Sequence, residues 1–254
     1  MPAETGRANQ ASPKVVVQTA TFNEAATIAS LLTSIGDVLP GARILVIDDE
    51  SPDGTGTIVA GMAATNPQIH LLQRHDQRGL GSAILDGLYF ARDLKADVSV
   101  YLDADSSHDP GDIPRLLDAL QSASHEEAPY DIAIGSRRVP GGRTLGWPPT
   151  RHLASWLVCG FTRWILGVPV KDASGGFRAV RLNCLDRLDL AGIAEGYAFQ
   201  EDFLWRAHRA GTRMIEVPIT FTNRTKGNSK ADFAEMLRSV AALLRIAWKT
   251  WLGH

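Results

Sequence analysis

The sequence of 254 residues predicts an α/β protein with a mostly parallel sheet. Short aliphatic runs alternate with helical stretches of about a dozen residues, which is typical of βαβ units. Hydrophobic residues make up 44% and charged residues 21% of the chain, as in globular proteins with a substantial core. The formal net charge of −2 gives no overall positive field, so we expect no nucleic-acid partner.

The first half of the chain alternates most regularly. Each predicted strand is a short aliphatic run, rich in β-branched residues, that stops at polar residues or a turn. In chain order, the predicted elements are strand 14–19, helix 25–39, strand 42–47, helix 55–64, strand 69–72, a glycine-rich turn at 78–82 that opens a helix to 91, strand 98–102, helix 112–121 and strand 131–134.

The second half is less regular. Helices are predicted at 151–166 and 200–210, strands at 176–181 and 214–221, and a basic polar loop at 222–230. Residues 231–252 are predicted to form one long amphipathic helix, because apolar residues recur three or four positions apart. The expected stripe contains Phe233, Met236, Leu237, Val240, Leu243, Leu244, Trp248 and Trp251, with Arg238, Arg245 and Lys249 outside it.

Three parts of the chain are expected: a flexible tail over residues 1–13, one continuous domain over 14–230 and the amphipathic helix over 231–254. The tail is polar and lacks the apolar segment of a signal peptide, and no run of 18 apolar residues predicts a membrane span. We therefore expect a cytoplasmic protein that touches a membrane only at its surface. The Trp and Lys residues of the last helix suit a bilayer interface, whereas such a stripe also suits packing on the protein's own core.

Four polar clusters follow predicted strands at their carboxyl ends, namely residues 48–49, 79–82, 103–105 and 135–137. Parallel strands bring these ends to one edge of a sheet, where ligands bind. Asp103 and Asp105 are two apart, so their carboxylates can converge on one hard cation that also binds phosphate oxygens. Alternatively, Asp105 or Asp109 caps a following helix.

The other clusters also leave two interpretations open. Asp49 can accept hydrogen bonds from a nucleotide base or ribose, while Ser51 or Asp53 can cap the next helix. The 79–82 turn can offer backbone N–H groups to an anion or be a plain tight turn, and it lacks the third glycine of a dinucleotide-binding motif. His108 can ligate a metal, cap a helix or support a ligand from behind.

Several arginines follow glycine, proline or turn residues. A guanidinium group suits bidentate recognition of phosphate, so we assign that role to Arg137, Arg151 and Arg224. Arg138 and Arg143 are expected to be solvated surface charges. Trp147 is expected to pack against the core or an interface and not to stack on a base.

Six motifs occur in order along the chain: ATFNE at 20–24, VIDDESPD at 46–53, DAD at 103–105, GSRRVPGG at 135–142, Asp172 with GGFR at 175–178, and GNSK at 227–230. Together they resemble the family 2 inverting glycosyltransferases and, within them, the dolichol-phosphate (polyprenyl-phosphate) mannose synthases. The resemblance spans about residues 15–230. It implies a GT-A fold, in which a Rossmann-like, mostly parallel sheet is flanked by helices.

The resemblance also implies an activity. The enzyme would transfer a hexose, with mannose from GDP-mannose favoured, to a polyprenyl (dolichyl-type) phosphate with inversion, using Mg²⁺ or Mn²⁺. By motif position, the nucleotide site is matched by Phe22, Glu24, Ile47, Asp49 and Asp103, and the metal site by Asp103 and Asp105. The acceptor-phosphate site is matched by Arg137, Arg151, Ser155 and Arg224, with Lys226 and Lys230 on the neighbouring loop. The expected catalytic residues are Asp105, Arg137, Arg151 and Arg224.

The acceptor determines which groups the chemistry needs. A phosphate monoester is already anionic at neutral pH, so it needs cations to position it and no general base. A sugar hydroxyl acceptor would need a base, for which Asp202 is the candidate. With a phosphate acceptor, Asp202 is expected to orient donor hydroxyls or pair with an arginine.

Other readings stay open. The same reaction can use UDP-glucose or another nucleotide sugar. A sugar nucleotidyltransferase usually carries a glycine-rich basic loop after its first strand, and this chain has neither glycine nor base at residues 19–24. A catalytically silent binding domain is disfavoured by the intact DAD motif and the arginines.

Overall fold

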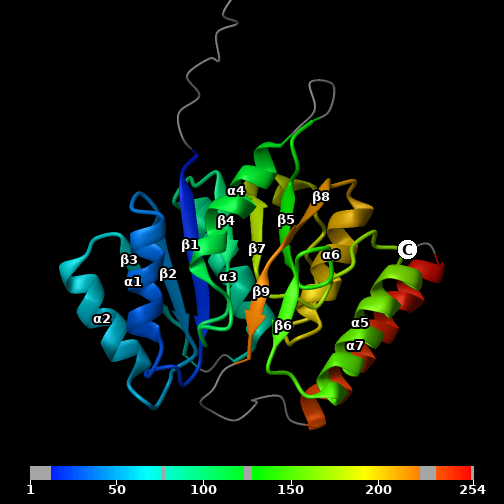
Figure 1. The fold of residues 1–254 in the computed structure, drawn as a ribbon, viewed down its shortest axis with the longest axis horizontal. Coiled ribbons are helices and arrows are strands. Elements are labelled where there is room, and N and C mark those ends of the chain that lie inside the picture. The colour runs from blue at the N-terminus through cyan, green and yellow to red at the C-terminus, as the bar shows by residue number, and fades with distance from the viewer. Residues whose placement is uncertain (1–12, 76–77, 123–127, 224–232, 253–254) are drawn as a thin grey trace, which may run out of the picture.

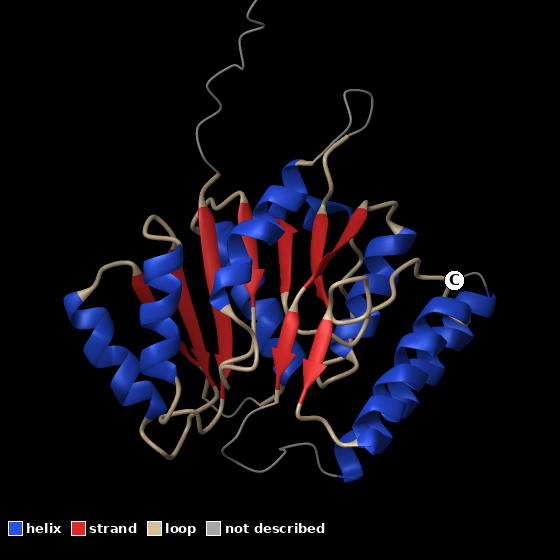
Figure 2. Ribbon diagram, in the orientation of Figure 1, coloured by secondary structure: helices blue, strands red, loops and turns tan. Residues whose placement is uncertain are grey.

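The structure is a computed structural model that describes residues 13–75, 78–122, 128–223 and 233–252. A seven-stranded sheet with strand order β3-β2-β1-β4-β7-β5-β8 lies between two layers of helices (Figure 1 and Figure 2). The strands are β1 Val15–Thr21, β2 Arg43–Asp48, β3 Ile69–Gln73, β4 Val98–Tyr101, β5 Ile132–Ser136, β7 Arg178–Arg181 and β8 Met214–Pro218. Strand β7 runs antiparallel to both of its neighbours, and the other pairs in this sheet are parallel.

The helices are α1 Ile28–Val38, α2 Thr55–Thr65, α3 Leu80–Asp93, α4 Ile113–Gln121, α5 Pro149–Trp164, α6 Phe199–Arg209 and α7 Phe233–Leu252. Short 3-10 turns lie at Pro110–Asp112 and Leu182–Arg187. The central strands β1 and β4 are buried along nearly their whole length because both sheet faces are covered. In β1, Val16 packs in the core with α3 and α6, while Val15 and Val17 pack in the core with α1 and α4. This architecture confirms the predicted fold class.

The structure corrects one predicted strand. The run at 214–221 is split into β8 and a short strand, β9 Thr220–Thr222. Pro218 ends β8, and proline lacks the N–H that a longer ladder would use. Strand β9 leaves the main sheet and pairs in parallel with β6 Arg143–Leu145, a strand that was not predicted.

Helix α7 does not present its apolar residues to one environment. Leu243 and Ile246 are buried in the core that α6 also supplies. Val240, Leu244, Trp248 and Trp251 are exposed on the other side. Of the predicted stripe, Leu243 therefore packs in the core, and Val240, Leu244, Trp248 and Trp251 lie at the surface. The side chains of Phe233, Met236 and Leu237 lie outside the described ones. Within the described ranges, no helix has the length and apolarity needed to cross a membrane.

Candidate active site

A cleft of about 1450 Å³ opens at the carboxyl ends of β1, β2 and β4 and extends to α5, α6 and α7. The predicted site residues that border it are Phe22, Glu24, Asp49, Asp103, Asp105, Arg137, Arg151 and Ser155. Ile47 is an exception, because its side chain is fully buried against α3 and belongs to the core. Arg224, Lys226 and Lys230 lie outside the described residues.

Asp103 and Asp105 follow β4 at the floor of the cleft. Oδ1 of Asp105 accepts the backbone N–H of Ser107 at 3.0 Å, so this carboxylate also fixes the turn. Burial raises the pKa of Asp103 and the charge of Asp105 raises it further, although His108 and two arginines act in the opposite sense. The positive charges nearby do not fully offset burial, so a cation beside this carboxylate would stabilise its charged form.

A metal at this site would need ligands from a bound molecule. Nowhere in the described part of the chain do three or more His, Cys, Asp or Glu side chains gather closely enough to hold an ion. Two carboxylates plus phosphate oxygens form the all-oxygen ligand set that Mg²⁺ and Mn²⁺ prefer. The residues at the end of β4 therefore fit a divalent cation that is shared with a diphosphate.

His108 lies behind Asp103 and does not border the cleft. Burial lowers the pKa of His108, so the ring is neutral, and its Nδ1 accepts the backbone N–H of Asp103 at 3.3 Å. The 3.6 Å approach of Nδ1 to the Asp103 carboxylate is accordingly not an ion pair. The ring packs between Phe177 and Phe221, with centroid distances of 5.2 and 5.1 Å. Among the roles left open by the sequence, this contact supports the one that orients Asp103.

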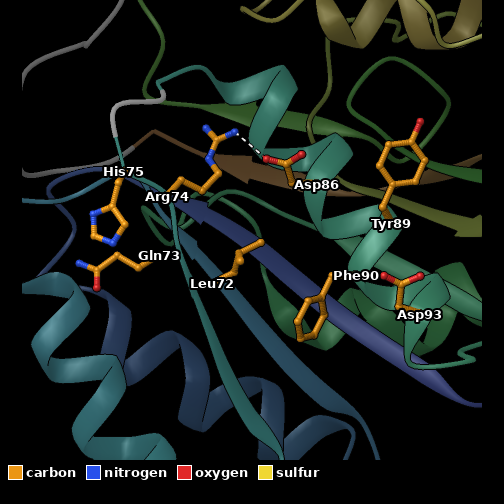
Figure 3. Close-up of a pocket in the computed structure, with 8 residues that line it drawn as sticks. All are labelled: Leu72, Gln73, Arg74, His75, Asp86, Tyr89, Phe90 and Asp93. Atoms are coloured by element: carbon orange, nitrogen blue, oxygen red, sulfur yellow. Dashed lines mark hydrogen bonds and ion pairs between the residues drawn. The ribbon is translucent and has the colours of Figure 1, made fainter.

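A buried arginine that the sequence analysis missed holds Asp49 in position. Arg74 follows β3, and its Nε and Nη2 lie 2.7 and 2.6 Å from Oδ1 of Asp49. The second carboxylate oxygen accepts the backbone N–H of Gly79 at 3.1 Å. Figure 3 shows the guanidinium group turned toward Asp86 of α3, 3.0 Å away. Asp49 is thus fixed at the edge of the cleft by contacts from two segments, the residue after β3 and the turn before α3.

The register of β2 and β3 explains why Arg74 meets Asp49. Asp48 pairs with Gln73, so the residues that follow the two strands are neighbours at the same edge. The sequence signal for this ion pair is an arginine directly after one predicted strand and an aspartate directly after the strand that lies beside it in the sheet.

The glycine-rich turn before α3 is a packing feature. The backbone N–H groups of Gly81 and Ser82 donate to the carbonyl of Glu195 at 2.7 and 3.2 Å. A Cβ at Gly81 would lie 2.5 Å from Cβ of Phe199, so only glycine fits there. These two amides are already used by the protein, which favours the plain tight turn among the two interpretations that the sequence left open.

Arg137 follows β5 and forms a buried ion pair with Asp172. Its Nη2 lies 2.6 Å from Oδ1 and its Nε 2.7 Å from Oδ2 of that carboxylate. Burial opposes both charges, but the hydrogen bonds between the two side chains raise the pKa of Arg137 and lower that of Asp172. The sequence included Asp172 in a motif without giving it a role, and the structure shows that it fixes Arg137.

The pair extends into a chain of hydroxyl groups. Nη2 of Arg137 donates to Oγ of Ser174 at 2.9 Å, and that oxygen lies 3.0 Å from Oγ of Ser155. Arg138 donates from Nη2 to the same Ser155 hydroxyl at 3.0 Å. Arg138 is half-buried, which corrects the expectation of a solvated surface charge.

The indole of Trp147 contacts the guanidinium groups of two arginines. The guanidinium carbons of Arg137 and Arg151 lie 4.9 and 4.3 Å from its ring centroid. Such contacts stabilise a cation by about 0.5–2 kcal/mol. Nη1 of Arg151 also donates to Asn223 at 2.9 Å, and Trp147 packs edge-on against Phe221. Trp147 is a packing residue as expected, and its packing brings both arginines to the cleft.

Asp202 of α6 lines the cleft but is not a free base. Its Oδ1 accepts Nε of Arg206 at 2.7 Å, and its Oδ2 accepts the backbone N–H of Ala194 at 2.9 Å. Both oxygens therefore serve the fold. This is the arginine pairing that the sequence offered as the alternative to general-base catalysis.

Comparison with known proteins agrees with this geometry. Residues 16–188 match Glycosyl transferase family 2. The chain is 42% identical over 211 residues to an undecaprenyl-phosphate mannosyltransferase of Micrococcus luteus, covering 83% of this chain and 84% of that protein. It is 40% identical over 212 residues to a polyprenol monophosphomannose synthase of Mycolicibacterium smegmatis, covering 83% and 78% of the two chains.

Solved structures show the same fold. Glucosyl-3-phosphoglycerate synthase from Mycobacterium tuberculosis, in complex with Mn²⁺, UDP and glucosyl-3-phosphoglycerate, superposes with a TM-score of 0.63 at 20% identity, over 95% of this chain and 79% of that one. The mostly parallel sheet with helices on both faces is a GT-A fold. On the extent of the family match and the identity to these relatives, the chain is a member of glycosyl transferase family 2.

Proposed function

We propose that the protein transfers mannose from GDP-mannose to a polyprenyl phosphate, with inversion at the anomeric carbon. The observation that carries this proposal is the pair of arginines on Trp147, which borders the same cleft as Asp103 and Asp105. The cleft thus has a carboxylate side for a metal and diphosphate and a cationic side for an acceptor phosphate. The two mannosyltransferase relatives at 40–42% identity support mannose as the sugar.

The donor end of the site follows from the residues around Asp49. Phe22 and Glu24 border the cleft beside Asp49, and the guanidinium carbon of Arg78 lies 4.6 Å from the Phe22 ring. Asp49, held by Arg74, accepts hydrogen bonds from the nucleotide. Asp103 and Asp105 hold Mg²⁺ or Mn²⁺, which when bound neutralises charge on the departing nucleoside diphosphate.

The acceptor end needs positioning rather than deprotonation. A phosphate monoester carries its nucleophilic oxygen as an anion at neutral pH. Arg137 and Arg151 orient the phosphate toward the anomeric carbon. Holding the two reacting groups in this geometry lowers the entropic part of the activation barrier. Ser155 assists through its hydroxyl. Arg224, Lys226 and Lys230, which lie outside the described residues, complete the cationic side in this proposal.

The proposal is tested by a panel of radiolabelled donors. The intact protein is incubated with undecaprenyl phosphate in detergent micelles, Mn²⁺ and either GDP-mannose or UDP-glucose, and label is counted in the organic phase. We expect lipid-phase label from GDP-mannose, and none when the acceptor is omitted. Label from UDP-glucose alone would identify the alternative donor, and the absence of lipid-phase label from both donors would contradict the proposal.

The protein is further proposed to lie on the cytoplasmic face of a membrane. Helices α5 and α7 run along the same edge of the molecule and both border the cleft (Figure 1). Their exposed apolar side chains are Leu153, Trp156, Leu157 and Trp164 of α5 and Val240, Leu244, Trp248 and Trp251 of α7. Arg163, Arg245 and Lys249 lie on the same helices. Exposed Trp beside Arg and Lys suits the headgroup region of an anionic bilayer.

The double variant Trp248→Ser/Trp251→Ser is expected to weaken membrane binding at least tenfold. Two Trp rings that enter the interface each bury apolar area worth about 1.5 kcal/mol or more. Partitioning is measured by co-sedimentation with liposomes that contain phosphatidylglycerol. Tyr89→Ser, an aromatic change on α3 outside the cleft, is the control and should sediment like the wild type. Unchanged sedimentation of the double variant would show that these two residues do not contact the bilayer.

A further inference from the structure

Glu201, in the first turn of α6, has no role in the arrangement described above. The residue is 4% exposed and borders the cleft, and no hydrogen bond or ion pair joins its side chain to another described residue. Burial raises the pKa of Glu201 to about 7, although a hydrogen bond with its own backbone N–H and the charges of Arg178 and Arg137 act in the opposite sense. The carboxyl borders the cleft without bonding any other described residue, so it is available to a ligand there.

The two neighbours of Glu201 in this turn differ in how fully their polar atoms are bonded. Asp202 is held by Arg206 and the backbone of Ala194. Gln200 accepts a hydrogen bond from Tyr101 through its Oε1 at 3.5 Å, but its amide nitrogen is buried and has no partner. The turn therefore brings two groups to the cleft, the unpartnered amide nitrogen of Gln200, which can donate hydrogen bonds, and the Glu201 carboxyl, which can accept them.

The amide of Gln200 lies next to the expected diphosphate site. A Cβ built on Gly176 would be 2.8 Å from Oδ1 of Asp103 and 3.6 Å from Nε2 of Gln200, so one residue's width separates them. In a nucleotide sugar, the hexose is bonded directly to the terminal phosphate. A diphosphate held at Asp103 therefore brings the hexose to the first turn of α6.

We infer that Glu201, assisted by Gln200, binds hydroxyl groups of the donor hexose and contributes to the choice of sugar. This inference rests on the proposed transfer from a nucleotide sugar. Each hexose hydroxyl both donates and accepts a hydrogen bond, which matches a carboxyl beside an amide. A site built to bond a hydroxyl discriminates strongly against ligands that lack it, because its buried groups are then left unpaired.

The test compares nucleotide sugars with the corresponding nucleoside diphosphates. Binding of GDP-mannose, GDP, UDP-glucose and UDP to the intact protein is measured by calorimetry with Mn²⁺ and without acceptor. For the nucleotide sugar that the wild type binds, we expect Glu201→Gln to weaken binding at least tenfold and Glu201→Ala to weaken it further. Both variants should bind the matching nucleoside diphosphate within twofold of the wild type. Glu195→Gln, which alters an exposed carboxyl at the border of the same cleft, should change neither affinity.

Thermal unfolding provides the second measurement. Because the Glu201 carboxyl is 4% exposed and bonds no other described residue, removing its charge in Glu201→Gln should keep or raise the Tm. The inference is overturned if the variant binds the nucleotide sugar like the wild type, if sugar and diphosphate affinities fall together, or if the Tm drops. Failure of the wild type to bind any of the four nucleotides would instead contradict the proposed function, and this inference with it.

Discussion

Asp105→Ala is expected to lower kcat about 10³-fold while the protein folds normally. The carboxylate is one of the two at the end of β4 that fit a divalent cation, and charge stabilisation at a departing diphosphate is worth several kcal/mol. In the fold this carboxylate accepts the backbone N–H of Ser107, a hydrogen bond whose loss costs about 1 kcal/mol. Turnover is measured as mannose transferred to undecaprenyl phosphate, and folding by circular dichroism.

Asp109→Ala is a matched control for this variant. Asp109 also accepts the N–H two residues ahead, from Gly111 at 2.8 Å, but it does not border the cleft. It should therefore retain nearly full turnover. Excess EDTA should abolish wild-type activity, and added Mg²⁺ or Mn²⁺ should restore it. Full activity in EDTA would refute the metal site at Asp103 and Asp105.

Asp172→Ala is expected to destabilise the protein by about 3–5 kcal/mol. The change leaves the guanidinium group of Arg137 buried and unpaired, which is costly in a dry site. The side chains of Arg137 and Asp172 are 6% and 0% exposed. The free energy of unfolding is measured by urea denaturation. Asp186→Ala provides the comparison. The ion pair of Asp186 with Arg92 is 3.6 Å long and largely exposed, so its loss should lower the free energy of unfolding by only about 0–1 kcal/mol.

The loss of unfolding free energy caused by Asp172→Ala should become smaller as the pH falls. Although burial opposes the charge, hydrogen bonds from Arg137 hold the pKa of Asp172 below its usual value. A carboxyl whose pKa is lower in the folded state stabilises the protein above its unfolded pKa of about 3.9 and loses this contribution as the pH falls through the folded value. The difference between wild type and variant should be constant near neutral pH and shrink in acid. Equal destabilisation by Asp172→Ala and Asp186→Ala would contradict the importance of the buried pair.

Much of the site could be predicted from local sequence. The strands ending at Asp49 and Asp103 are recognisable from short aliphatic runs, and parallel pairing then brings the residues after them to one edge whatever the details of packing. The same reasoning gave the fold class and the position of α6. It failed at residues 214–221, because local hydrophobicity does not reveal that β9 leaves the sheet to pair with β6.

The amino-acid sequence by itself therefore determined the α/β class, the edge at which ligands bind and the carboxylates and arginines gathered there. Only the tertiary structure decided what those groups contact. Arg137 meets Asp172 across 35 positions, Arg74 meets Asp49 across 25, and the turn at Gly81 meets Glu195 across more than a hundred. Such pairs leave no periodicity in the sequence, because strand register and helix packing bring them together. For the same reason, only the folded chain distinguishes Asp202, whose oxygens are occupied, from Glu201, whose carboxyl borders the cleft without bonding another described residue.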